Sequence, residues 1–192
     1  GSTVRYIEYL SNYEFGTDIK DAYFVDCGLT YSGTAATSIS GLTHLEGEKI
    51  VVLGDGATHP DRTVSSGSIT LARSVEKAHI GFNYKSTLQT MRIDAGGTEG
   101  TSQGKNKRIN NITLRLYRSV GVKVGSSEAE LDLIPFRSSA DDMSEALDMF
   151  TGDKEVEFRG GYDNDGFVFV RQDQPLPLTV LAIFPRLQTF DQ

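Results

Sequence analysis

Apolar and polar residues alternate in short runs along the chain, and turn-forming residues separate the runs. The clearest run is 111–118, in which aliphatic residues occupy every second position: Ile112, Leu114 and Leu116. A period of two places alternate side chains on opposite faces of a strand. The pattern therefore predicts a half-buried strand, with these three residues in a core and Arg115 exposed.

Similar runs predict strands over most of the chain. They fall at residues 4–10, 49–53, 68–72, 78–84, 88–93, 120–124, 155–158, 167–171 and 178–184. Gly54-Asp55-Gly56 and Asp163-Asn164-Asp165-Gly166 are strong turn signals between such runs. Helix is scarce, and the best candidate is 140–150, with acidic residues in its first turn. Many short strands and little helix predict an all-β protein.

A glycine-rich stretch at 95–106 divides the chain, and we expect it to form a flexible loop. We expect an N-terminal strand and linker at 1–21, a small β-barrel at 22–94 and a β-sandwich at 107–192. The N-terminal run 4–10 could supply a strand to this sandwich. Gly1 and Ser2 are interpreted as the remnant of a purification tag.

Composition excludes several classes of protein. A single cysteine, Cys27, rules out an intrachain disulfide and a cysteine-based zinc cluster. No apolar run approaches the roughly 20 residues that a membrane helix needs, so no membrane anchor is expected. The net charge of −7 argues against tight nucleic-acid binding. The small basic cluster of Lys105, Lys107 and Arg108 is interpreted as a solvated strand face, with contact to DNA or to an acidic neighbour as the alternative.

Two glycine-containing motifs resemble ligand-binding loops but lack their essential residues. Gly100 and Gly104 are too close for a phosphate-binding loop, and Asn106 follows Lys105 where such a loop has serine or threonine. The segment Asp163–Gly166 starts like a calcium loop, but Phe167 and Val168 stand where its fifth and sixth residues belong. A β-turn is the better interpretation of that segment.

No catalytic arrangement is visible in the sequence. His44, His59 and His79 have no metal-ligating partner at helical spacing, and no Gly-x-Ser-x-Gly motif occurs. Cys27 has no local activating group and is expected to be a small buried hydrophobe. We therefore expect no enzyme activity, no catalytic, cofactor-binding or metal-binding residues, no cofactor and no small-molecule substrate.

Several segments resemble the C-terminal region of tail nozzle proteins of short-tailed bacteriophages, the tail tubular protein B type. They include Gly41-Leu42-Thr43-His44-Leu45-Glu46-Gly47-Glu48, Val52-Leu53-Gly54-Asp55-Gly56 and Ile134-Pro135-Phe136-Arg137. The resemblance extends over nearly the whole chain, and the order of these motifs is more specific than any one of them. Such regions contain a module that resembles the first catalytic cysteine half-domain of the ubiquitin-activating enzyme. Cys27 matches no catalytic motif of that enzyme, so no ubiquitin chemistry is implied.

The resemblance implies a structural part of a virion rather than an enzyme. It implies a fragment of a larger tail protein, located in the phage tail, whose intact form makes a homo-oligomeric ring with other tail proteins around the DNA conduit. The alternative is a host-receptor or carbohydrate-binding module of a phage tail. That function needs exposed aromatic side chains over a shallow groove, for which Tyr13, Phe15 and Tyr162 are candidates. A hydrolase is a third possibility.

Overall fold

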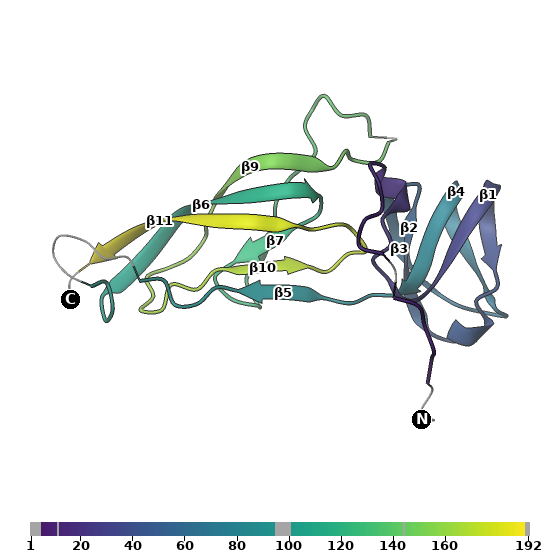
Figure 1. Ribbon diagram of the computed structural model, residues 1–192, viewed down its shortest axis with the longest axis horizontal. Helices are drawn as coiled ribbons and strands as arrows, with labels where there is room; N and C mark the ends of the chain where they lie inside the picture. Colours follow the sequence, from purple (N-terminus) through teal and green to yellow (C-terminus); the bar gives the residue numbers. More distant parts are fainter. Residues whose placement is uncertain (1–4, 11, 95–100, 144, 191–192) are drawn as a thin grey trace. The chain divides into compact units, whose positions relative to one another are not determined.

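The computed structural model describes residues 5–10, 12–94, 101–143 and 145–190, and it is an all-β structure with three antiparallel sheets (Figure 1). The chain folds into two compact units. The first comprises Gly1–Tyr84, Ser139–Asp148 and Asp173–Pro177, and the second comprises Lys85–Ser138, Met149–Gln172 and Leu178–Gln192. The N-terminal segment of the first unit ends at Tyr84, earlier than the boundary near residue 95 that the glycine-rich stretch suggested, and two later segments of the chain belong to the same unit.

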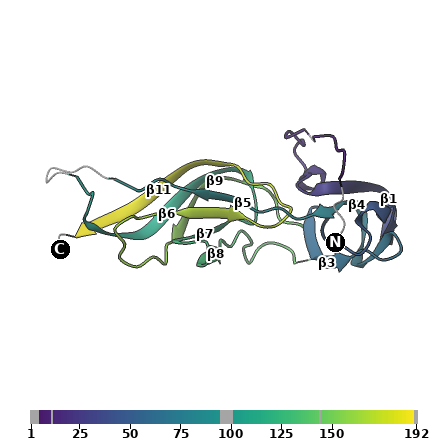
Figure 2. The same cartoon turned by 90° about the horizontal axis from the view of Figure 1, so that it is seen from below.

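The first unit contains one four-stranded sheet. Its strands are β1 (Asp26–Ser40), β2 (Lys49–Gly54), β3 (Ala57–Thr63) and β4 (Ser68–Phe82), in the order β1-β4-β2-β3. β1 and β4 pair along their length with several bulges, and the sheet is curled (Figure 2). Two single-turn 3₁₀ helices, η1 (Ile19–Asp21) and η2 (Thr43–Leu45), flank it.

The barrel expected for residues 22–94 is wrong, because this sheet stays open. Its edge strands, β1 and β3, do not pair with each other within the described chain. Pro60 lies in β3 and has no N–H to donate, which suits an edge strand. The bulges of β1 bend the sheet around its core without closing it.

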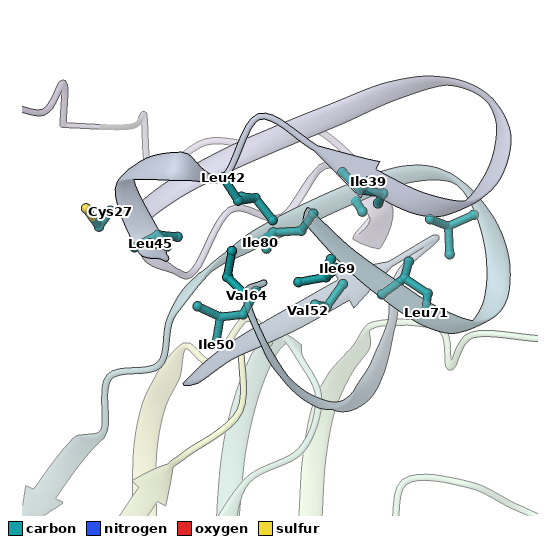
Figure 3. Packing of buried hydrophobic residues seen from close by; sticks show 12 residues of the cluster. Cys27, Ile39, Leu42, Leu45, Ile50, Val52, Val64, Ile69, Leu71 and Ile80 are labelled. Atoms are coloured by element: carbon teal, nitrogen blue, oxygen red, sulfur yellow. The ribbon is translucent and has the colours of Figure 1, made fainter. Parts of the chain in front are cut away.

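The core of the first unit lies on the concave side of this sheet (Figure 3). Leu42 and Leu45 enter it from η2 and its N-terminal flank, while Ile50 and Val52 enter from β2 and Ile80 from β4. Each of these side chains is at most 1% exposed. Leu42 and Leu45 of the Gly41–Glu48 motif are therefore packed into the core, whereas the other residues of the motif are exposed.

The second unit is a sandwich of two sheets. One has the order β5 (Ser86–Gln89), β10 (Phe169–Gln172), β7 (Lys123–Gly125), β8 (Leu131–Leu133), and the other has the order β11 (Val180–Phe190), β6 (Asn106–Ser119), β9 (Phe150–Glu157). Figure 1 shows the strands of the two sheets running alongside each other. Leu114 of β6 packs in the same cluster as Val124 of β7 and Val170 of β10, so the two sheets share one core.

The strand predicted at 111–118 is confirmed as part of β6. Ile112, Leu114 and Leu116 are buried, and Arg115 is exposed. The helix predicted at 140–150 is wrong, since the described residues of that segment contain no helix and Phe150 begins β9. Residues 5–10 form no strand and belong to the first unit, so they do not join the sandwich. Residues 95–100 of the expected loop lie outside the described residues.

The central position of Leu114 predicts a large loss of stability on truncation. Leu114→Ala should lower the free energy of unfolding by about 2–5 kcal/mol, because it leaves a cavity between two sheets. Leu181→Ala is the matched control, since Leu181 in β11 is 60% exposed and its truncation should cost little. Urea unfolding of both variants tests this, and equal losses would show that the assigned register is incorrect.

Candidate functional site

A cleft of about 1020 Å³ in the first unit is the candidate site that we describe. Five of the eight tyrosines of the chain line it, together with two phenylalanines. We call it the tyrosine cleft and define it by these seven aromatic residues: Tyr6, Tyr9, Tyr13, Phe15, Tyr23, Phe24 and Tyr84. Glu8, Asp26 and His44 add polar groups to its lining.

The extended segment 5–10 forms one wall of the tyrosine cleft. The Tyr6 hydroxyl donates to the backbone oxygen of His44 at 3.1 Å, and the Glu8 carboxylate accepts the backbone N–H of Cys27 at 3.2 Å. Ile7 and Tyr9 alternate with these anchors and are fully exposed. One face of the segment is thus attached to the unit, and the other face is open to solvent.

Residues from distant parts of the sequence complete the cleft. The ring of Phe15 meets the ring of Phe24 edge to face at 5.8 Å, and Tyr13 beside it is 60% exposed. Tyr23 is held inward, its ring edge-on to that of His79 at 5.3 Å. Tyr84 follows the end of β4 and is 38% exposed.

Cys27 lies in the lining of this cleft but is poorly suited to be a nucleophile. It is 7% exposed and packs into the core of the first unit, as expected for a small hydrophobe. Burial, with the neighbouring Glu8 carboxylate, raises the pKa of its thiol to about 11. The thiol is therefore protonated at neutral pH. Nε2 of His44 bonds to the backbone oxygen of Cys27 at 3.1 Å, so this nitrogen is engaged by the main chain.

His79 is a buried structural histidine with both ring nitrogens bonded. Its Nε2 lies 3.0 Å from the backbone oxygen of Lys20, and since a carbonyl can only accept, Nε2 carries the proton. Its Nδ1 then accepts from the hydroxyl of Thr30 at 2.9 Å. Burial lowers the pKa of His79. The side chain of His79 therefore joins η1, β1 and β4.

His59 is also buried, but its Nε2 has no hydrogen-bond partner in the described structure. It lies in β3 against Gly54, where an added Cβ would stand only 2.8 Å from Nε2. Burial lowers the pKa of His59, and the positive charges of Arg73 and Arg62 lower it further, while Asp55 opposes them. Because its ring is buried against Gly54, we assign His59 to packing.

The Asp163–Gly166 turn is held by cations of the chain itself. Lys107 is 1% exposed, and its Nζ donates to the backbone oxygen of Asn164 at 2.9 Å. Asp165 pairs with Arg92 at 2.6 Å, and Asp163 accepts the N–H of Gly166 at 3.1 Å. No group of three His, Cys, Asp or Glu residues that could hold a metal occurs in the part of the chain that the structure describes.

The basic cluster expected from the sequence is not a continuous surface. Lys107 is buried, which corrects its assignment to a solvated face. Arg108 lies over the ring of Tyr162, with 5.6 Å from its Cζ to the ring centroid. Arg115 makes a bidentate pair with Asp153 at 2.7 and 2.8 Å. Long-range contacts therefore bury or pair these cations, and sequence spacing gave no sign of this.

The three aromatic candidates from the sequence are not brought together. Tyr13 and Phe15 line the tyrosine cleft, but Tyr162 belongs to the second unit, where its ring contacts that of Phe190 at 5.2 Å. Sequence reasoning missed Tyr6, Tyr9 and Tyr84 as members of the cleft. The recurrence of tyrosine in residues 5–10 is the one signal that could have indicated the first two.

No family model matches the chain, and no curated protein matches it. None of the helices in the described ranges is long and apolar enough to cross a membrane.

The two buried histidines predict a first unit that is sensitive to acid. Both have a folded-state pKa below the ordinary value of 6.5, so the folded chain binds fewer protons than the unfolded chain. Their contribution to stability is complete above about pH 6.5 and is lost as the pH falls below it. Urea unfolding at pH 7.5 and pH 5 should show this loss, and His59→Gln should reduce it. If the variant lost as much stability between pH 7.5 and pH 5 as the parent, His59 would not contribute to the acid sensitivity.

The occupied Asp163–Gly166 turn predicts no tight calcium binding. Its oxygens already meet Lys107, Arg92 and a backbone N–H, and a calcium site needs about 6–8 free oxygen ligands. Calorimetric titration with CaCl₂ should give no saturable heat at micromolar concentrations, and the melting temperature should not rise. Micromolar binding with a higher melting temperature would contradict this assignment.

Proposed function

We propose that the chain is a structural, non-enzymatic component of a bacteriophage tail, derived from the C-terminal region of a nozzle protein. In this proposal it assembles in the virion with other tail proteins, as part of a homo-oligomeric ring around the DNA conduit. The proposal starts from the sequence motifs that resemble the nozzle family. The structure supports it by showing what those motifs do in the fold and which surface is left for neighbours.

The motifs that carry the resemblance serve to hold turns. The Glu46 carboxylate accepts the backbone N–H groups of Ser66 and Gly67 at 2.8 and 2.7 Å. The Asp55 carboxylate accepts those of Glu76 and Lys77, with a shortest distance of 2.9 Å. Their most distinctive acidic residues are thus used to fix the scaffold, which suits a structural protein.

The observation that carries the proposal is the apolar surface of edge strand β11. Leu181, Phe184 and Phe190 are 60%, 46% and 41% exposed along this strand. Within the described residues β11 pairs only with β6, so its other edge offers backbone groups to a neighbour. A long edge strand with exposed apolar side chains normally marks an interaction site. In a virion, a neighbouring tail protein would cover it.

Electron microscopy of the virion that contains the parental protein tests the proposal. We expect density for both β units in the tail, repeated by rotational symmetry, with β11 in contact with a neighbour. Phe184→Asp should reduce incorporation into particles. Leu133→Asp, which changes a 56% exposed residue on β8, is the control and should not. Virions that lack this density would overturn the proposal.

A structural part that borders a DNA conduit should let DNA pass without adhering to it. Non-specific binding draws on the release of counterions by exposed Lys and Arg, but Lys107 is buried and Arg115 is paired with Asp153. The net charge of −7 adds a repulsive field. Fluorescence anisotropy with a labelled duplex at physiological salt should show no binding. A dissociation constant below about 10 μM would contradict this, since typical non-specific values are roughly 10⁻⁴–10⁻⁶ M.

A further inference from the structure

We propose that the tyrosine cleft binds a short, uncharged oligosaccharide. This inference goes beyond the structural role proposed above and does not depend on it. It concerns only the first unit, whereas the assembly surface proposed above lies on β11 of the second unit. The two proposals can therefore fail separately.

The kind of aromatic residue in the cleft points to a sugar. Tyrosine combines a flat apolar ring with a hydroxyl group, so one side chain can stack on the C–H face of a sugar ring and bond its hydroxyls. Tyr6, Tyr13 and Tyr84 are 40%, 60% and 38% exposed in the cleft, which leaves ring surface accessible to a ligand. An apolar ligand would leave the tyrosine hydroxyls unused, and tyrosine outnumbers phenylalanine five to two here.

The polar groups of the cleft fit hydroxyl donors. Glu8 and Asp26 line it with carboxylates, and Asn12 adds an amide. Carboxylate oxygens accept hydrogen bonds from sugar hydroxyls, and they repel anions. With a net charge of −7 on the whole chain, these carboxylates favour a neutral sugar over an acidic one.

The size of the cleft favours several sugar units over one. Its volume of about 1020 Å³ is just above the range for small-molecule sites, roughly 300–1,000 Å³. The exposed rings come from the extended segment 5–10, from Tyr13 and from Tyr84 after β4, so they are distributed along the cleft walls. A linear chain of sugars could contact them in succession. A second copy of the protein would instead bring another charge of −7 to this surface.

The absence of tryptophan from the sequence makes the binding directly measurable. Tyrosine emission dominates the intrinsic fluorescence, and five of eight tyrosines line the cleft. We would titrate the complete chain with maltohexaose and chitohexaose as neutral probes, and screen an array of uncharged bacterial glycans in parallel. At least one glycan should bind saturably, with a change in tyrosine emission.

Variants separate the cleft from other exposed aromatics. Tyr13→Ala and Tyr84→Ala should each weaken binding about tenfold or more, because each removes a stacking surface. Tyr84→Phe should retain most of the affinity. Tyr162→Ala is the matched control, since Tyr162 is 58% exposed in the second unit, and it should bind as the parent does. Thermal unfolding of each variant verifies that the first unit stays folded.

Three outcomes would overturn the proposal. The first is that none of these glycans binds at concentrations up to about 10 mM. A dissociation constant above this value would correspond to a binding free energy too small for a specific site. The second is an equal loss of binding in Tyr13→Ala and Tyr162→Ala. The third is a concentration-dependent dimer in sedimentation experiments that Tyr13→Ala dissociates, which would assign the cleft to a second copy of the chain.

Discussion

Carboxylates that accept backbone N–H groups hold the turns of this protein, and the strands depend on them for their position. Strands use their N–H groups in the sheets, but the long connections leave others without a partner. Glu46 satisfies such groups in the first unit and Asp163 does so in the second, while Asp55 accepts two N–H groups of β4 and so fixes the turn between β2 and β3. Asp94 similarly accepts the N–H of Ser102 at 3.3 Å and its hydroxyl at 2.9 Å. Each of these bonds joins segments that are separate in sequence or closes a tight turn. Losing one would therefore free a loop or turn in addition to removing a hydrogen bond.

Because acidic residues are used in this way, the net charge of −7 does not by itself indicate an acidic binding surface. Several of the carboxylates are fixed by the fold and are not available as ligands or catalysts. Others are paired with cations, as Asp153 is with Arg115 and Asp165 is with Arg92. Lys107 adds an internal ammonium group at a turn that resembles the start of a calcium loop. The charged residues of these turns are thus consistent with support of a scaffold.

The alternation of apolar and polar residues predicted those parts of the structure that depend on neighbouring residues in the sequence. β6 followed from its aliphatic alternation, and the all-β class followed from the recurrence of such runs. β1 was missed because its middle, 31–38, is rich in Thr, Ser, Ala and Gly and lies mostly exposed, so no apolar alternation marks it. The barrel failed because closure depends on whether edge strands pair, which a period of two does not encode. The burial of Lys107 and the tyrosine cleft depend on contacts between residues far apart in sequence, so spacing alone could not predict them.

The paired charges of the β11–β6–β9 sheet bear on how an acidic chain could assemble with copies of itself. Like charges on neighbouring copies repel, and a net charge of −7 favours separation. On this sheet, however, Glu155 lies 3.4 Å from Arg186, and the Arg115 guanidinium that binds Asp153 also lies over the ring of Phe184, with 5.2 Å from its Cζ to the ring centroid. Such pairs reduce the local field and leave aromatic surface beside it. Burying them against a neighbour would desolvate partnered charges, which costs less than burying isolated ones. The repulsion between the negative charges of two copies would then act mainly between surfaces outside their interface. Salt screens that repulsion over a distance of about 8 Å at physiological ionic strength.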